Sequence, residues 1–201
     1  EGGQGRGHVR VYGWNGITWT QLGVDIDGPA ALGSFGWSVS LSADGNRLAA
    51  SAPYHLGIKN EKGMVRVYEW DGTNWAQLGA DIEGTAILER LGSSLSLSAD
   101  GNYMAAGAPY VDGNGLNVGI VRVYRWNGIA WIQPGAIIYG EAAHNLSGWS
   151  VSLSADGSRL AIGAPHNSDN GGTAGHVRVY SLPISFPADA CVDSHDITPL
   201  F

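Results

Sequence analysis

The sequence contains one cysteine, Cys191, and two lysines, Lys59 and Lys62, among its 201 residues. A single thiol excludes an internal disulfide, so cysteine usage does not indicate a redox compartment. The 11 basic residues are outnumbered by 18 acidic ones, and the formal net charge is −7. This balance argues against a nucleic acid or an anionic membrane surface as a partner.

Long apolar runs and helix signals are also missing from the chain. A membrane-spanning helix needs about 20 consecutive apolar residues, and no run approaches that length, so we expect no membrane span. Charged residues make up only 14% of the chain, against about 25% in typical globular proteins, which argues against long helices and coiled coils. The chain begins at Glu1 without an initiator methionine or a signal-peptide pattern, which suggests a processed or partial product.

Glycine and large aromatic residues are abundant instead. The chain has 31 glycines, eight tryptophans and eight tyrosines, and 44% of its residues are hydrophobic. Disordered chains lack that many groups suited to burial. The composition therefore predicts a folded, turn-rich, all-β protein.

An internal repeat organises the sequence. The tetrapeptide Val-Arg-Val-Tyr recurs every 56 residues, and paired tryptophans and Ala-Asp-Gly triplets follow the same period. The four copies are Val9–Tyr12, Val65–Tyr68, Val121–Tyr124 and Val177–Tyr180. This period predicts blades of a β-propeller, each with four antiparallel strands, and 201 residues hold about 3.6 units.

Turn residues divide each unit into strands and loops. The strands predicted for one unit are Trp37–Leu41, Arg47–Ala52, Met64–Trp70 and Asn74–Leu78. We expect a primed turn at Asp44-Gly45, because both residues tolerate positive φ. The longer connections Tyr54–Gly63 and Gly79–Arg90 should meet at the opposite edge of the sheets, here called the long-loop rim, where binding is usually found. Residues 1–182 form the repeats in this interpretation, and residues 183–201 an extended tail in which Cys191 could bond to a partner.

The placed motifs resemble a known family. Phe35-Gly36 opens a unit, and similar tripeptides close the second strands, namely Ser51-Ala52-Pro53, Gly107-Ala108-Pro109 and Gly163-Ala164-Pro165. This pattern, from His8 to Leu182, resembles the FG-GAP repeat of integrin α-subunits and of many secreted microbial and algal proteins. The resemblance implies an integrin-like β-propeller in cell adhesion or other protein binding, secreted or at the cell surface.

Calcium is the point at which the chain departs from that family. Integrin-type repeats usually carry an Asp-rich calcium loop between the first two strands, but Asp44, Asp100 and Asp156 stand alone in their turns. Calcium prefers six to eight oxygen ligands. We therefore expect these three residues to form turns.

Aromatic residues and histidines of the long loops are the predicted contact residues. The candidates for ligand binding are Tyr54, His55, Tyr110, Tyr139, His144 and His166. Weak calcium candidates in the long loops are Asp112, Asn114, Asp169 and Asn170, for which a turn role is the alternative. Asn145-Leu146-Ser147 is an acceptor sequence for N-glycosylation. No histidine pair has metal-ligand spacing, so we expect no zinc site and no cofactor beyond weak calcium.

Repeated polar and aromatic residues are predicted to belong to the scaffold. Rim carboxylates such as Asp25 and Asp81 could in principle hydrolyse glycosides, but they recur in register. The tryptophan pairs, such as Trp70 and Trp75, should pack across a hairpin and against a neighbouring blade. Each Val-Arg-Val arginine is expected to stack on a ring or to pair with a carboxylate.

Three functions are compatible with these features of the sequence. The leading hypothesis is a non-catalytic, extracellular or cell-surface module that binds a protein or a glycan through the long-loop rim. The alternatives are a hydrolase or lyase acting on polysaccharide or lipid, and a structural subunit of an assembly. Since 3.6 units are fewer than the four blades of the smallest propellers, we expect further blades, a homo-oligomer or a larger complex.

Overall fold

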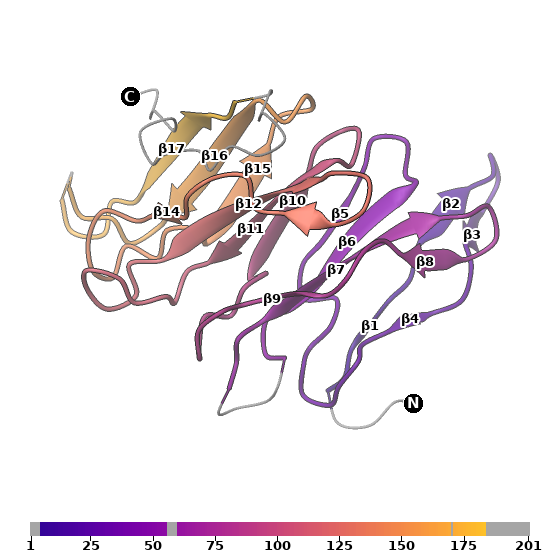
Figure 1. The fold of residues 1–201 in the computed structure, drawn as a ribbon, viewed down its shortest axis with the longest axis horizontal. Coiled ribbons are helices and arrows are strands. Elements are labelled where there is room, and N and C mark those ends of the chain that lie inside the picture. Colours follow the sequence, from indigo (N-terminus) through magenta and orange to yellow (C-terminus); the bar gives the residue numbers. More distant parts are fainter. Residues whose placement is uncertain (1–4, 56–59, 170, 184–201) are drawn as a thin grey trace.

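The computed structural model describes residues 5–55, 60–169 and 171–183 (Figure 1). These residues form strands, turns and loops, and no helix occurs among them. Within the same residues, no segment qualifies as a helix that could span a membrane. The predicted all-β class is confirmed, whereas Cys191 and Asn170 lie outside the described residues.

The strands form four successive units, called the first to fourth blades below. The first consists of β1 (His8–Val9), β2 (Tyr12–Trp14), β3 (Trp19–Gln21) and β4 (Ile26–Asp27). The second consists of β5 (Val39–Leu41), β6 (Arg47–Ala52), β7 (Met64–Trp70), β8 (Trp75–Gln77) and β9 (Ile82–Glu83). The third consists of β10 (Ser94–Leu97), β11 (Tyr103–Ala108), β12 (Ile120–Trp126), β13 (Trp131–Ile132) and β14 (Ile138–Tyr139). The fourth consists of β15 (Ser150–Leu153), β16 (Arg159–Ala164) and β17 (His176–Ser181).

The second and third blades are antiparallel sheets in the predicted order, with one correction. The path β5-β6-β7-β8 matches the four predicted strands, but β9 also pairs with β7, so that Val65 lies opposite Ile82. The outer strand therefore continues after a break near Gly79, whose φ is +83°. Part of the predicted loop Gly79–Arg90 is thus strand, and the rim loop begins only after β9.

The tight turns differ from the predicted primed type. Gly45 has a φ of +72°, but Asp44 is not among the residues with positive φ. The Gly45 N–H donates to the Ser42 carbonyl at 3.0 Å, and Asp44 Oδ1 accepts from the Asn46 N–H at 2.9 Å. The turn is therefore a type I turn followed by a left-handed glycine. Asp100 and Asp156 accept the equivalent bonds, which confirms the turn-forming interpretation.

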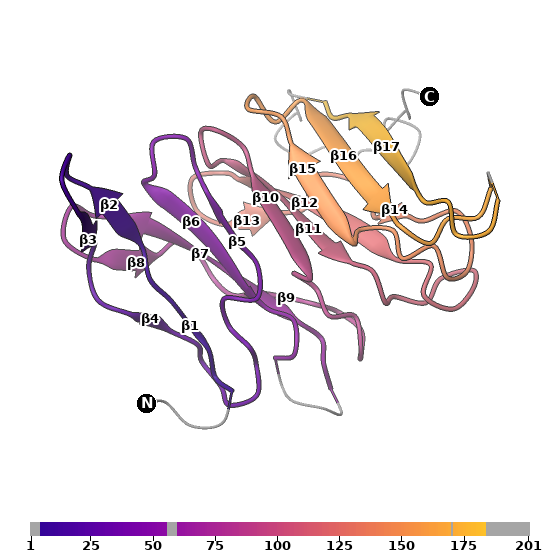
Figure 2. The ribbon, with the colours of Figure 1, turned by 180° about the vertical axis from the view of Figure 1, so that it is seen from behind.

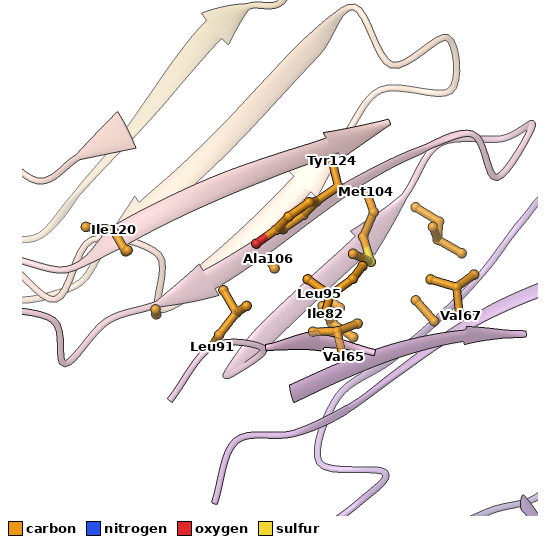
Figure 3. Close-up of a cluster of buried hydrophobic side chains, with 12 residues drawn as sticks. Val65, Val67, Ile82, Leu91, Leu95, Met104, Ala106, Ile120 and Tyr124 are labelled. Carbon is orange, nitrogen blue, oxygen red and sulfur yellow. The ribbon is translucent and has the colours of Figure 1, made fainter. Parts of the chain in front are cut away.

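The core lies between consecutive blades. Figure 3 shows Val65 and Val67 of the second blade facing Leu95 and Met104 of the third, and all four side chains are at most 8% exposed. Because every second residue of a strand points to the same face, a sheet with apolar residues on both faces can pack between two neighbours. Equivalent clusters fill the other two junctions.

Hydrogen bonds also join the blades along their innermost strands. The N–H groups of Leu95 and Leu97 donate to Ser38 Oγ at 3.1 Å and to Ser40 Oγ at 2.9 Å. The Leu153 N–H donates to Ser96 Oγ in the next junction. The alternating serines of the first strands therefore satisfy backbone groups that an exposed sheet edge would leave open.

The row of blades does not close within the described residues. Figures 1 and 2 place the first and fourth blades at opposite ends of the row. Val39 is 51% exposed, whereas its equivalent Leu95 is 8% exposed, and Val177 is 66% exposed, whereas Val65 is fully buried. Both end faces thus present apolar residues that inner blades cover.

The tryptophan pairs pack as predicted, both with each other and between blades. Trp70 and Trp75 have ring centroids 5.3 Å apart, and Trp75 Nε1–H donates to the Leu22 carbonyl of the preceding blade at 3.1 Å. Trp131 makes the same bond to Leu78. The equivalent Trp19 lies at the open end and is 65% exposed.

We predict that Trp75→Ala lowers the free energy of unfolding by about 2–3 kcal/mol, since a half-buried ring and one hydrogen bond are lost. Trp19→Ala, the matched control at the open end, should cost less than about 1 kcal/mol. Urea unfolding of both variants tests this. Equal losses would mean that the inter-blade contact contributes nothing.

Candidate ligand pocket on the long-loop rim

The rim loops follow a path that the repeat itself sets. Leu32, Leu88 and His144 occupy equivalent positions, and each has a φ between 62° and 63°. Ser34, Arg90 and Leu146 form a second such set, with φ between 52° and 54°. Left-handed backbone at residues with side chains is strained. Because the strain recurs in register, it belongs to the shared loop framework and does not by itself mark a binding site.

An aromatic pocket opens between these loops. It has a volume of about 230 Å³, and its lining residues come from the second, third and fourth blades. They are Trp37, Tyr54, Ser93, Pro109, Tyr110 and Trp149. The Trp37 and Tyr54 rings meet edge-on at 5.4 Å, and the Tyr110 and Trp149 rings meet at 6.3 Å. The pocket thus has two aromatic pairs as its walls.

The repeat explains why a pocket exists here. Trp37, Ser93 and Trp149 stand at equivalent positions, 56 residues apart. The middle unit alone has a small hydroxyl in place of an indole ring. Space that a third tryptophan would occupy is therefore open, with the flanking indoles on either side.

Arg90 fixes the two tyrosines relative to each other. Its guanidinium carbon lies 5.2 Å from the Tyr54 ring centroid and 4.7 Å from the Tyr110 ring centroid. Glu61 accepts a hydrogen bond from Arg90 Nε at 2.5 Å, and its side chain is buried. A cation held between two ring faces attracts both, so the tyrosines are ordered before any ligand arrives.

A groove adjoins the pocket on the same rim. It has a volume of about 360 Å³ and is lined by Ile87, Leu88, Arg90, Tyr110 and Leu116, among others. Tyr110 lines both the pocket and the groove. A ligand longer than one ring could therefore extend from the pocket along the groove.

The rim carboxylates pair with the repeated arginines, as predicted. Arg10 bonds Asp25 through two nitrogens, and Arg66 bonds Asp81 in the same way at 2.8 Å. The hydrogen bond from Arg66 lowers the pKa of Asp81 below its ordinary value. These carboxylates are therefore committed to the scaffold, which leaves them unsuited to act as a general acid and base.

In the third blade the repeated arginine, Arg122, pairs with a different carboxylate. Ile137 stands where the aspartate would be, and Arg122 instead donates to Glu89 at 3.0 Å. Glu89 also accepts from the backbone N–H groups of Thr85 and Ala86. Its side chain is 1% exposed, so this ion pair is buried under the groove.

Two of the six predicted ligand-binding residues, Tyr54 and Tyr110, come together in the pocket. His55 is only 8% exposed, and its Nε2 lies 3.9 Å from a Glu83 oxygen, so it is not presented to a ligand. Tyr139, His144 and His166 are exposed, but they line neither the pocket nor the groove.

The remaining predicted sites have different surroundings. Asp112 accepts a hydrogen bond from the Asn117 N–H at 2.8 Å, which is a turn role, and Asn114 is exposed beside it. Asp169 accepts a hydrogen bond from Asn167 at 3.0 Å in the last rim loop. Asn145 is 4% exposed. A glycan at Asn145 would need that side chain to leave the interior, so the folded chain disfavours glycosylation there.

Sequence reasoning missed Trp37 and Trp149 as pocket residues. Both are about half exposed, although large aromatic residues usually bury most of their surface. The available signal was the break in the repeat at Ser93, because a lost side chain between two retained ones leaves a cavity.

Comparison with known proteins supports the fold. No family model and no curated protein sequence matches the chain. Among solved structures, a Bacteroides uniformis protein assigned as a 6-phosphogluconolactonase aligns with a TM-score of 0.61 and 13% identity, over 98% of this chain and 51% of that one. The periplasmic gluconolactonase of Pseudomonas aeruginosa aligns with a TM-score of 0.53 and 16% identity, over 86% and 45% of the two chains. The β-propeller domain of Cps50 (Swd1) from Myceliophteria thermophila gives a TM-score of 0.46 at 13% identity, over 81% and 38%.

The row of antiparallel sheets and the two alignments with a TM-score above 0.5 support an all-β fold of the propeller type. The chain spans about half the length, or less, of the solved structures that it matches. At these identities the likeness concerns the fold alone, and the FG-GAP pattern remains a resemblance.

The buried Arg122–Glu89 pair gives a testable contrast with the exposed Arg10–Asp25 pair. We predict that Glu89→Ala lowers the free energy of unfolding by about 3–5 kcal/mol, since it leaves a buried charge unpaired. Asp25→Ala should cost much less, because both side chains of that pair are more than a third exposed. Denaturant titration of both variants is the measurement. Similar costs would show that burial does not distinguish the pairs.

Proposed function

We propose that this chain is a non-catalytic module that binds a carbohydrate through the pocket formed by Trp37, Tyr54, Tyr110 and Trp149. The observation that carries the proposal is the pair of half-exposed indoles separated by the small Ser93. A sugar ring has one face of C–H groups that packs on an aromatic ring and a periphery of hydroxyls that needs polar partners.

The pocket offers both kinds of contact. The indoles supply apolar surface, and the Ser93 hydroxyl, which donates to the Arg90 carbonyl at 2.8 Å, has lone pairs left to accept from a sugar hydroxyl. Its volume of about 230 Å³ is below the 300–1,000 Å³ of sites for drug-sized ligands, which favours a ligand entering with about one ring. The adjoining groove would hold a second unit, so an oligosaccharide fits better than a monosaccharide.

The rim carboxylates are paired with arginines, which favours binding over hydrolysis as the function. Asp25, Asp81 and Glu89 each pair with an arginine. None of the residues that line the pocket carries a carboxylate. The groove is lined by Glu89, which pairs with Arg122, and by Asp112, which accepts from the Asn117 N–H. We further propose, on the FG-GAP resemblance, that the protein acts outside the cell or on its surface. Labelling of intact cells with an impermeant reagent would mark it there, and labelling only after lysis would contradict this.

We predict that the protein binds one or more members of an oligosaccharide array and that Tyr110→Ala weakens this binding at least tenfold. Ser93→Trp should abolish binding, because an indole there would fill the pocket. The fold should tolerate that change, since two equivalent positions carry tryptophan. Trp19→Ala, an exposed aromatic residue away from the rim, is the control and should bind normally. Isothermal titration with the best array ligand measures these differences.

Two results would overturn the proposal. Undiminished binding by a folded Ser93→Trp variant would place the ligand elsewhere. Release of reducing sugar from the bound oligosaccharide, lost in Tyr110→Ala, would show that the site is an active site.

The open end faces lead to a second proposal about assembly. We propose that further blades of a larger propeller cover Val39 and Val177, in place of a second copy or an unrelated subunit. Native mass spectrometry of the 201-residue chain should then show no discrete ring. A single defined homo-oligomer would instead favour the second copy.

A further inference from the structure

A histidine and two acidic residues meet at the fourth blade. One ligand atom from each of Glu141, Asp169 and His176 lies within 4.8 Å of the other two. Glu141 follows β14, Asp169 lies in the loop between β16 and β17, and His176 begins β17. The fold therefore gathers three potential metal ligands from three separate segments.

Two of these three residues, Glu141 and Asp169, do not recur at the equivalent positions of the other units. The positions 56 residues earlier carry Thr85, Gly113 and Ile120. A histidine recurs at His8, three periods before His176, and Glu141 pairs with Arg178 as other carboxylates pair with the repeated arginines. The combination of all three residues occurs once at these repeat positions, where the loop after β14 meets the fourth blade.

The charges around Glu141 leave one of its oxygens available. Arg178 pairs with Glu141 Oε1, while Oε2 lies 3.6 Å from His176 Nε2. That separation is too long for a normal hydrogen bond. It is close to the roughly 3.4 Å between two ligand atoms of one tetrahedral ion with bonds of 2.0–2.1 Å.

Asp169 is held by a buried neighbour. Asn167, which is 1% exposed, donates from Nδ2 to Asp169 Oδ2 at 3.0 Å and accepts from the Asp169 N–H at 3.0 Å. Ligating carboxylates in metal sites are commonly oriented by such hydrogen bonds. The other Asp169 oxygen stays free to take part in the cluster.

Asn145 supplies an independent observation. It is 4% exposed, and its Nδ2 has no hydrogen-bond partner. Together with Glu141 and His176 it lines a cavity of about 10 Å³, which has room for about one water-sized sphere. A buried polar group without a partner is costly. Rotation of the Asn145 amide about χ2 would exchange Nδ2 and Oδ1 and so offer an oxygen as a fourth metal ligand.

We propose that Glu141, Asp169 and His176 bind one divalent first-row metal ion, with Zn²⁺ the best fit. One imidazole nitrogen and two carboxylate oxygens suit Zn²⁺, whereas Ca²⁺ requires six to eight oxygens. Zinc takes the place of calcium, for which Asp169 was a weak candidate, and the site uses a histidine that linear spacing could not connect. The ion would tie two rim loops to β17 in a blade that has three strands among the described residues.

Titration of the chelator-treated protein with ZnCl₂ tests the site. We expect saturable binding of one ion per chain, and a rise in melting temperature that EDTA reverses, because an ion that binds only the folded state stabilises it. Asp169→Asn and His176→Gln should each weaken zinc affinity at least about tenfold. Co²⁺ in place of Zn²⁺ should give the visible absorption of a tetrahedral N/O site, and His176→Gln should remove it.

His166→Gln and Asp27→Asn are the matched controls, since both residues are exposed and lie outside the cluster. Both variants should bind zinc like the unmodified chain. Asp169→Asn replaces an exposed carboxylate with an amide of the same shape, so the variant should fold. Circular dichroism checks this. The proposal is overturned if no saturable binding occurs up to about millimolar Zn²⁺, or if the double variant Asp169→Asn/His176→Gln binds it undiminished.

Discussion

Burial of both faces of each sheet between its neighbours is the interaction on which this structure depends. The strands are two to seven residues long, and sheets of such strands are at most marginally stable alone. Val65 and Val67 on β7 reach almost complete burial only because the third blade covers them, whereas the equivalent Val177 on β17 lies open. Each blade is therefore stabilised by the next one. The buried contacts between blades also hold the strands that carry the rim loops.

This dependence shapes where function can arise. The residues that bury the faces, turn the chain and pair the arginines are constrained in every unit, so substitutions accumulate at the rim. Ser93 between Trp37 and Trp149 opens the aromatic pocket, and Glu141, Asp169 and His176 form their cluster where the loop after β14 meets the fourth blade. In both places the departure from the repeat carries the chemistry, and the repeated framework fixes its geometry.

The sequence predicted the fold well wherever local signals agreed. β6 and β7 have the bounds expected for Arg47–Ala52 and Met64–Trp70, since alternating apolar residues end at clear turns. β9 was missed because a two-residue strand after a break has no periodicity to detect. The turn at Asp44 was assigned the wrong type, because Asp-Gly suits a primed turn in a two-residue loop and here sits in a longer one.

The candidate sites were predictable only in part, for the same physical reason. Tyr54 and Tyr110 could be selected because they lie in the long loops, but Trp37 and Trp149 stand at the start of a first strand and so resembled scaffold residues. His176 lies 35 residues from Glu141 in the sequence. No spacing rule joins residues so far apart, and only the pairing of β16 with β17 brings Asp169 and His176 near the loop that follows β14.

The serine bonds between innermost strands give the row of blades a direction. Ser38 accepts from the blade that follows, and Ser96 does the same one junction later, whereas the N–H groups of Ala43 and Ala99 donate to carbonyls of the blade that follows. The two faces of a blade therefore carry different sets of donors and acceptors. Two copies meeting through the same face would not reproduce this pairing of unlike faces. A sheet that extends the row with the same bonds joins it head to tail, which is a heterologous contact rather than a two-fold symmetric one.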